Sequence, residues 1–270
     1  MNPVAGAASA ALGVQVATDP TRAGVTLGGP EGAETIVFVH GTRLTSTMWA
    51  AQQAAFADEF RTIAVDLPAH GARAAERFTL DGAAQVVRAA IDDHATDRRA
   101  VVVGLSLGGY VAMALAAREP ALVRGLVLSG ATAEPIGARS LPFLALAGLM
   151  DRVGTDRLDR YNTWFFRRRY PPEIAEPIIA GGFWPKGGAQ ALRALVGERF
   201  VPRLAAYPGP TLILNGERDL IFRQSATIFA AAAVDVRRIR LAGATHLANL
   251  DRPRAFSEAI RRFVTSLPAD

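Results

Sequence analysis

The sequence predicts an α/β fold in which a mostly parallel sheet is flanked by helices. Short runs rich in β-branched and apolar residues alternate along the chain with longer segments whose apolar residues have helical spacing, which is the pattern of βαβ units. Half of the 270 residues are apolar and a fifth are charged. A chain of this length and composition can form one large core, with room for an inserted subdomain.

Strands and helices follow one another in a regular order outside residues 134–206. We expect strands at 36–39, 61–66, 100–103, 125–129, 211–214 and 236–241. We expect helices at 47–60, at 79–93 with Thr79 as the N-cap, directly after the strand 100–103 as far as residue 118, and at 253–267. The carboxyl ends of parallel strands lie at one edge of the sheet, where open α/β sheets hold their sites.

Residues 134–206 have a different character. Aromatic residues, arginines and prolines crowd together at 161–172, and the pattern is helical without intervening strands. We therefore expect residues 134–206 to form an inserted helical lid. The α/β core is then formed by residues 1–133 and 207–270.

The composition excludes several classes of site. The chain contains no cysteine, so disulfides, thiolate metal sites and a cysteine nucleophile are excluded. No pair of histidines has metal-ligand spacing near a carboxylate, and we expect neither a metal nor a cofactor. The net charge of +5 comes from arginines scattered among 25 acidic residues. This pattern is typical of a solvated surface, so we expect no nucleic-acid partner.

The sequence also lacks features of membrane attachment or export. No apolar stretch reaches the roughly 18 residues that a membrane-spanning helix needs. Residues 1–13 are alanine-rich but lack the basic region of a signal peptide, and we expect them to form a tail. We therefore expect a cytoplasmic protein without a membrane partner.

Residues 104–108 read Gly-Leu-Ser-Leu-Gly and lie between a buried strand and an alanine-rich helical stretch. This is the context of a nucleophile elbow, a turn so sharp that the neighbours of its serine must be very small. The turn exposes the Ser106 hydroxyl at the edge of the sheet. It also directs the N-terminus of the next helix toward the reacting carbonyl. An ordinary strand-to-helix turn is the alternative interpretation.

A serine hydroxyl needs an adjacent base that is itself oriented by an acid. After a nucleophile elbow, the acid and then the histidine follow later in the chain. Two residues that follow later strands fit the roles of acid and base. Asp219 follows the strand 211–214 and is the expected acid, with Glu217 as the alternative. His246 follows the strand 236–241 and is the expected base. The competing interpretations are a turn-former or helix cap at Asp219 and an ordinary loop histidine at His246.

Together these residues resemble the α/β-hydrolase superfamily over nearly the whole chain. Its motifs match here as follows: the His-Gly strand end at 40–41, Gly-x-Ser-x-Gly-Gly at 104–109, the Gly-x-x-Asp acid loop at 216–219, and the closing histidine at His246. Its Asp-x-x-Gly-His-Gly loop occurs at 66–71 with Ala69 in place of the first glycine. The resemblance implies the α/β-hydrolase fold.

An oxyanion hole made of two backbone amides is expected beside such an elbow. One donor is the N–H of Leu107, directly after the nucleophile. The other is an N–H after the His-Gly pair, that of Thr42. His40 and His70 are expected to be structural, with His40 bracing the oxyanion loop.

The expected substrate contacts are Arg43, beside the oxyanion donor, and Trp164, Phe165 and Trp184 of the lid. The lid aromatics either line an acyl or aromatic pocket or form the lid's own core. Residues 167–169 are three arginines, which either bind a substrate carboxylate through their guanidinium groups or form a solvated helix face.

The sequence thus predicts a serine hydrolase that cleaves a small carboxylic ester or lactone through an acyl-enzyme. Serine at the elbow counts against the haloalkane dehalogenases and epoxide hydrolases of the superfamily, which use aspartate there. Residues 246–253 resemble the tail of the 3-oxoadipate enol-lactonases and their esterase relatives. Two alternatives use the same residues: acyl transfer or cofactor-free perhydrolysis on the same triad, and a ligand-binding receptor of the same fold.

Overall fold

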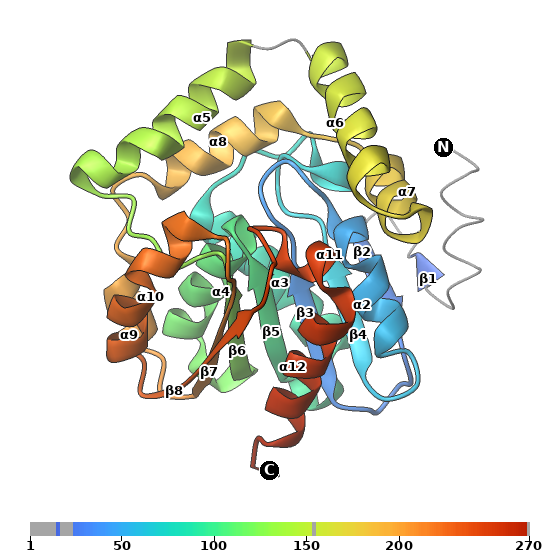
Figure 1. The fold of residues 1–270 in the computed structure, drawn as a ribbon. Coiled ribbons are helices and arrows are strands. Elements are labelled where there is room, and N and C mark those ends of the chain that lie inside the picture. The colour runs from blue at the N-terminus through green and yellow to red at the C-terminus, as the bar shows by residue number, and fades with distance from the viewer. Residues whose placement is uncertain (1–14, 17–23, 153–154, 269–270) are drawn as a thin grey trace.

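One central sheet with helices on both faces organises the molecule (Figure 1). The computed structural model describes residues 15–16, 24–152 and 155–268. The expected tail at residues 1–13 lies outside the described residues. The arrangement of sheet and helices confirms the predicted α/β class.

The sheet has eight strands within the described residues. They are β1 (Gln15–Val16), β2 (Val25–Gly28), β3 (Thr35–Val39), β4 (Arg61–Val65), β5 (Ala100–Leu105), β6 (Val123–Ser129), β7 (Pro210–Gly216) and β8 (Asp235–Leu241). Their order across the sheet is β1-β2-β4-β3-β5-β6-β7-β8. Strands β3 to β8 are parallel, and β1 and β2 pair antiparallel at one edge. The loops after the parallel strands therefore meet along one edge of the sheet.

Successive side chains of each central strand enter two different cores. In β3, Val37 and Val39 share a core with α3 (Leu80–His94), α4 (Leu107–Arg118) and α10 (Leu220–Ala232). Ile36 and Phe38 share the other core with the aromatic residues on both sides of α2 (Ala50–Ala55) and with α12 (Pro253–Thr265). All four side chains are fully buried. A parallel strand covered on both faces requires such a continuous apolar run.

The predicted strands β3 to β8 and the predicted helices are confirmed, with two differences. The expected helix 47–60 is shorter, since a 3₁₀ turn at Ser46–Trp49 leads into α2 and turns follow as far as Phe60. Strands β1 and β2 have no counterpart among the predicted strands. They are only two and four residues long, and β2 is held by antiparallel pairing with β4, which a periodic pattern does not reveal. Thr79 caps α3 as predicted, and its hydroxyl accepts the Gly82 N–H at 3.0 Å.

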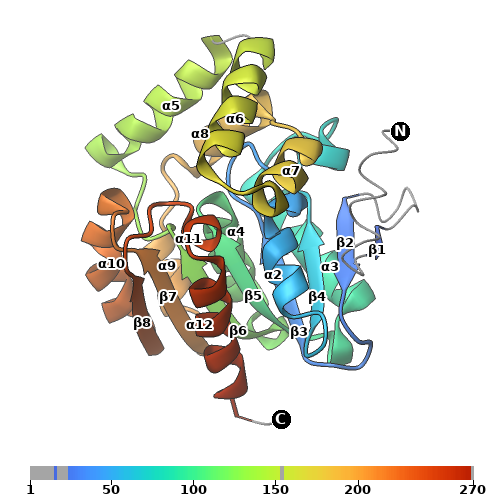
Figure 2. The same cartoon turned by 45° about the vertical axis from the view of Figure 1, so that its right-hand side comes forward.

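Within the described residues, five α-helices follow a 3₁₀ turn at Gly137–Ser140 between β6 and β7. They are α5 (Leu141–Arg152), α6 (Thr155–Arg169), α7 (Pro172–Gly181), α8 (Pro185–Leu195) and α9 (Phe200–Ala205). Figures 1 and 2 show α5 to α8 together at one end of the sheet, and we call these four helices the cap. Helix α9 packs beside α4 and α10 instead. That residues 134–206 act as a lid stays a prediction.

Candidate active site

Ser106 occupies the sharp turn between β5 and α4. Its φ angle is +53°, in the left-handed region that residues other than glycine seldom adopt. Its N–H donates to the Ser129 carbonyl at 2.7 Å, and its carbonyl accepts the Gly109 N–H at 2.9 Å. Hydrogen bonds on both sides of the residue therefore hold the strained conformation in place.

Two glycines permit this turn because the backbone passes too close for a side chain. A Cβ atom at Gly104 would overlap the backbone of Gly108. A Cβ atom at Gly108 would overlap the carbonyl of Val39, the last residue of β3. The first turn of α4 thus lies directly against both β5 and β3, and the small residues on either side of Ser106 follow from this packing.

Asp219 and His246 form a hydrogen-bonded pair beyond the ends of β7 and β8. Nδ1 of His246 lies 2.8 Å from Oδ2 of Asp219. The Asp219 side chain is buried, and the Phe222 ring stacks on the imidazole with ring centroids 4.9 Å apart. Because Nδ1–H donates to the carboxylate, Nε2 keeps its lone pair and can accept a proton.

Glu217, the alternative acid, lies elsewhere. Its side chain is exposed, and Oε2 accepts the Gly243 N–H at 2.8 Å. The structure therefore brings Asp219, and not Glu217, to the imidazole of His246.

The turn Ser129-Gly130 after β6 brings Ser106 and His246 to the same place. Ser129 accepts the Ser106 N–H, and Gly130, at a φ of +58°, leaves room for the imidazole. A Cβ atom at Gly130 would lie 2.7 Å from Nδ1 of His246 and 3.2 Å from Oδ2 of Asp219. Within the part of the chain that the structure describes, the Ser106 hydroxyl and His246 form no hydrogen bond. Such bonds are often long until a substrate binds.

The amides of Thr42 and Leu107 lie at the ends of neighbouring strands. Thr42 follows β3, which pairs with β5, and Leu107 opens α4 directly after Ser106. The first N–H groups of a helix have no partner inside the helix. Among the described residues, neither amide has a hydrogen-bond acceptor. Two backbone donors on either side of a nucleophile are the arrangement that stabilises an oxyanion.

Two buried histidines hold the loop that carries Thr42. Nε2 of His40 accepts the Leu67 N–H at 2.9 Å, and Nε2 of His70 accepts the Arg43 N–H at 3.1 Å. Each Nδ1–H donates to a backbone carbonyl, so both rings are neutral. Burial lowers the pKa of His40 to about 4, and burial together with the neighbouring His40 lowers the pKa of His70 to about 3. The structural role expected for both histidines agrees with these contacts.

Ala69 stands where the superfamily loop has glycine, and it adopts the conformation of a glycine. Its φ angle is +65°, and its N–H donates to the Arg73 carbonyl at 2.9 Å. An alanine in this left-handed region costs about 1 kcal/mol relative to glycine. The turn next to His70 therefore keeps its shape despite the substitution.

Asp251 connects the loop of His246 to the cap. Its Oδ2 accepts both the backbone N–H of Thr245 at 2.7 Å and the Thr245 hydroxyl at 2.6 Å. Its Oδ1 accepts the Tyr170 hydroxyl at 2.9 Å and a guanidinium N–H of Arg169 at 2.6 Å. Burial raises the pKa of Asp251, but these hydrogen bonds outweigh it, and the net shift is downward. The carboxylate thus stays charged and fixes the residue before His246.

Arg43 belongs to the loop after β3 that carries Thr42, and its side chain reaches the cap. Its φ angle is +59°, and its carbonyl accepts the Trp184 N–H at 2.9 Å. Its Nη1 donates to Oδ1 of Asn162, a buried side chain of α6, at 2.9 Å. The structure therefore places Arg43, an expected substrate contact, directly beside the Thr42 amide.

The aromatic residues of the cap are divided between its core and its surface. Phe166 and Phe183 are buried and stack with ring centroids 5.6 Å apart, so they belong to the cap's own core. Phe165 is half-buried, whereas Trp164 is 61% exposed. Of the three aromatic side chains expected at the substrate, Trp164 thus faces solvent in this structure.

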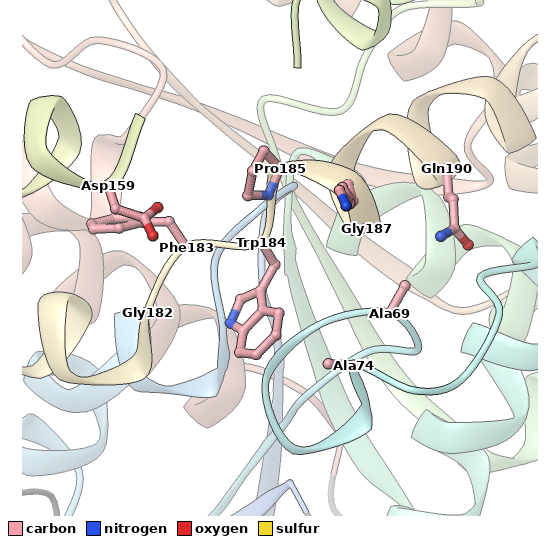
Figure 3. A pocket seen from close by; sticks show the side chains of 10 residues that line it. Ala69, Ala74, Asp159, Gly182, Phe183, Trp184, Pro185, Gly187 and Gln190 are labelled. Carbon is pink, nitrogen blue, oxygen red and sulfur yellow. The ribbon is translucent and has the colours of Figure 1, made fainter. Parts of the chain in front are cut away.

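A pocket of about 520 Å³ lies between the loop 69–74 and the connection from α7 to α8. Figure 3 shows the Trp184 indole directed toward the loop that carries Ala69 and Ala74. This volume is within the range of small-molecule sites, about 300–1,000 Å³. The backbone N–H of Trp184 donates to the Arg43 carbonyl, so this wall adjoins the loop after β3, but neither Ser106 nor His246 lines the pocket. The lining residues are Ala69, Ala74, Asp159, Gly182, Phe183, Trp184, Pro185, Lys186, Gly187 and Gln190.

The three arginines at residues 167–169 are all exposed. Arg167 forms an ion pair with Glu176 at 2.8 Å, and Arg169 forms one with Asp251 at 2.6 Å. These positions match the solvated helix face, and two of the three guanidinium groups hold parts of the protein together.

The described ranges contain no candidate metal centre and no candidate membrane-spanning helix. No group of three or more His, Cys, Asp or Glu side chains in them is placed to hold a metal ion. Among the helices of the same ranges, none is long and apolar enough to cross a membrane.

Residues 36–259 match the model of the alpha/beta hydrolase family. The chain belongs to this family. It is 26% identical over 256 residues to 3-oxoadipate enol-lactonase 1 of Acinetobacter baylyi, covering 90% of this chain and 93% of that protein. It is 30% identical over 253 residues to a pimeloyl-[acyl-carrier protein] methyl ester esterase of Xanthomonas oryzae pv. oryzae, and the match covers 86% of this chain and 96% of that protein. Family and fold are thus as the sequence predicts.

A solved structure shows the same fold. The enol-lactonase from Burkholderia xenovorans superposes with a TM-score of 0.75 at 24% identity, covering 90% of this chain and 96% of that one.

Three residues around the site have no role in the predictions from sequence. Gly130 carries only a weak signal, as a glycine directly after a strand. Asp251 lies within the segment 246–253 that resembles the enol-lactonases, and this resemblance is the sequence feature that could have identified it. No feature of the sequence identifies Asn162, because its hydrogen bond to Arg43 joins residues that are 119 positions apart in the chain.

Gly130→Ala will reduce ester hydrolysis much more than Gly137→Ala. Both glycines have positive φ, +58° and +55°, so both substitutions strain the backbone by about 1 kcal/mol. A Cβ at Gly137 meets nothing within 4 Å, whereas one at Gly130 displaces His246. We expect similar losses in thermal unfolding midpoint but a further fall of about 100-fold in kcat/KM for Gly130→Ala. Equal activities of the two variants would contradict the positioning role of Gly130.

Acid will destabilise the fold through His40 and His70. In the unfolded chain a histidine has a pKa of about 6.5. Because both folded pKa values lie lower, the unfolded state binds more protons below pH 6.5. The free energy of unfolding then falls by up to about 1.4 kcal/mol per pH unit for each histidine as the pH drops toward 4. Urea unfolding at pH 7.5, 6.5, 5.5 and 4.5 measures this slope, which His70→Gln should make shallower. A free energy that stays flat over this interval would refute the prediction.

Proposed function

We propose that this α/β hydrolase is a carboxylic ester hydrolase that acts on a small ester or lactone through a Ser106 acyl-enzyme. The observation that carries the proposal is that one turn, Ser129-Gly130, contacts both Ser106 and the His246–Asp219 pair. Ser129 holds the backbone of Ser106, and Gly130 makes room for the His246–Asp219 pair. The names of the two relatives, an enol-lactonase and a methyl ester esterase, support the same substrate class.

In this proposal His246 acts first as a base and then as an acid. Nε2 takes the proton of the Ser106 hydroxyl as Oγ attacks the substrate carbonyl. Asp219 holds Nδ1–H and stabilises the imidazolium that forms. The imidazolium then protonates the departing alkoxide, which leaves the acyl group on Oγ. Water, activated by the same Nε2, hydrolyses this ester and restores Ser106.

The tetrahedral intermediates place a negative charge on the former carbonyl oxygen. The N–H groups of Leu107 and Thr42 are the proposed donors to this oxyanion. One such donor typically contributes about 3 kcal/mol to transition-state stabilisation. Both amides are fixed before the substrate arrives, by the packing of α4 on β3 and by the bond between the Arg43 N–H and His70.

Trp184 is a proposed substrate contact because it lines the pocket, and Arg43 is one because it directly follows Thr42 in the chain and its carbonyl accepts the backbone N–H of Trp184. Phe165 and Trp164 stay predictions, and the exposure of Trp164 places it at the outside of the cap. In the proposed enzyme, residues 134–206 act as the lid over the site.

Ser106→Ala will abolish turnover of 4-nitrophenyl esters and lactones. We expect wild type to hydrolyse members of a series from acetate to decanoate, tested beside γ-lactones and enol-lactones, and the preferred chain length to measure the acyl pocket. Removing the nucleophile should lower kcat/KM by about 10⁴-fold or more. A fluorophosphonate probe should label wild type and not the variant. Ser225→Ala, on α10, is the matched control and should retain activity.

Two other outcomes decide against hydrolysis. Labelling of Ser106 without turnover of any ester or lactone would favour acyl transfer or perhydrolysis. Addition of an alcohol acceptor or of hydrogen peroxide then distinguishes these two. Neither labelling nor turnover would contradict the triad and favour a ligand-binding receptor.

Thr42→Pro will impair the reaction far more than Thr42→Ala. Proline removes the backbone N–H, while alanine removes only a side chain whose hydroxyl contacts the Gly188 carbonyl weakly, at 3.5 Å. We expect kcat to fall by about 100-fold in the proline variant and by less than about threefold in the alanine variant. Thermal unfolding of both variants shows whether they are folded. An unchanged kcat in a folded Thr42→Pro variant would remove Thr42 from the oxyanion hole.

A further inference from the structure

Arg43 is a cation in an enclosed position. Its side chain is half-buried, and burial lowers the pKa of its guanidinium below the ordinary arginine value. The helices of the cap surround it: Nη1 donates to Asn162 of α6, and a Cβ at Gly188 of α8 would lie 3.3 Å from its own Cβ. The side chain thus extends from the oxyanion loop into the space beneath the cap.

The side-chain partner of this charge is a neutral amide. Among the described residues, no carboxylate lies within ion-pair distance of the Arg43 guanidinium, whose one side-chain partner is the neutral amide of Asn162. Some exposed arginines of the cap do have a carboxylate partner, since Arg167 pairs with Glu176 and Arg169 pairs with Asp251, but an exposed arginine without one remains hydrated. Enclosing an ionised group is costly unless a counter-charge accompanies it. Arg43 is more enclosed than Arg167 and Arg169, and its side chain has only a neutral partner among the described residues.

Two hydrogen bonds hold the backbone of Arg43, one at its N–H and one at its carbonyl. Its N–H is bound by His70 and its carbonyl by the Trp184 N–H, at 3.1 and 2.9 Å. These bonds keep a non-glycine residue at a φ of +59°, a strained conformation that persists only where the surroundings impose it. Its Cα is about 3.8 Å from that of Thr42, the proposed oxyanion donor. The guanidinium is thus attached to a fixed backbone position next to the proposed oxyanion donor Thr42.

We propose that Arg43 supplies the binding site for a carboxylate on the substrate, so that the natural ester or lactone is an anion. A planar guanidinium binds a carboxylate through two parallel N–H···O bonds, and Asn162 leaves enough of its donors free for this contact. The substrate then supplies the missing counter-charge. This assignment rests on the proposed function, because it places the carboxylate on a molecule whose ester carbonyl meets Ser106.

Esters that differ only in charge test the proposal. The monomethyl esters of succinic, glutaric and adipic acid carry one free carboxylate, and the corresponding dimethyl esters carry none. Hydrolysis of each releases acid, so a pH-stat at pH 7.5 measures kcat/KM for all six. We expect wild type to prefer the monoester at one of the chain lengths. In Arg43→Gln the ratio of kcat/KM for monoester to diester should fall about tenfold or more, and Arg43→Lys should lie between.

Arg168→Gln is the matched control. It removes the same charge from an exposed position on α6, so the ratio should stay that of wild type. An equal ratio in wild type and Arg43→Gln, or an equal fall in Arg168→Gln, would overturn the assignment to Arg43. Thermal unfolding confirms that the variants are folded, and Arg43→Lys keeps the test open should Arg43→Gln fail to fold.

Binding without turnover separates this proposal from the proposed function. Calorimetric titration of Ser106→Ala with the three monomethyl esters measures binding without turnover. At one chain length, the association constant of the monomethyl ester should exceed that of the dimethyl ester about tenfold. Adding Arg43→Gln to Ser106→Ala should remove this difference. Such binding with no hydrolysis by wild type would disprove the hydrolase and leave the carboxylate site standing. Absence of a preference for any of the monoesters would overturn the carboxylate site, whatever the hydrolytic activity.

Discussion

The close packing of α4 on β5 and β3 is the constraint on which the rest of the site depends. Gly104 and Gly108 leave no space for a Cβ, so the first turn of α4 lies against the Val39 carbonyl at the end of β3. This contact forces Ser106 to its positive φ and places the Leu107 amide beside the loop that follows β3. Ser106, the proposed nucleophile, and both expected oxyanion donors are therefore positioned by backbone contacts at the ends of neighbouring strands.

Burial of two histidines keeps that loop in place. A neutral imidazole offers one donor and one acceptor, whereas a protonated one offers two donors. His40 and His70 use their acceptors for the N–H groups of Leu67 and Arg43. Protonation would take both acceptors away, so the low pKa that burial gives each ring preserves the loop near neutral pH. In the superfamily pattern these histidines appear as sequence motifs, and here their function is to accept backbone hydrogen bonds.

The sequence is sufficient for those parts of the site whose geometry follows from local backbone chemistry. The elbow glycines, the position of Asp219 after β7 and that of His246 after β8 are all evident from motifs and strand ends. The choice of Asp219 over Glu217 follows from the Gly-x-x-Asp match at 216–219 and not from local geometry, because both residues lie on the same loop and the direction of each side chain depends on what packs against it. Glu217 is diverted to the Gly243 amide. Contacts between the cap and the core are also beyond the sequence, since Arg43 and Asn162 approach each other only after the whole chain has folded.

Helix α6 connects the loop that carries Thr42 and Arg43 with the loop that carries His246. Asn162 and Arg169 are seven residues apart, which is two turns and about 10.5 Å along one face of the helix. Asn162 binds Arg43 in the oxyanion loop, and Arg169, with the adjoining Tyr170, binds Asp251, which fixes the residue before His246. A movement of α6 would therefore disturb both loops together. Because the uncompensated charge of Arg43 lies at one end of this link, an anion bound there would hold α6 in the same position that orders the loop of the histidine.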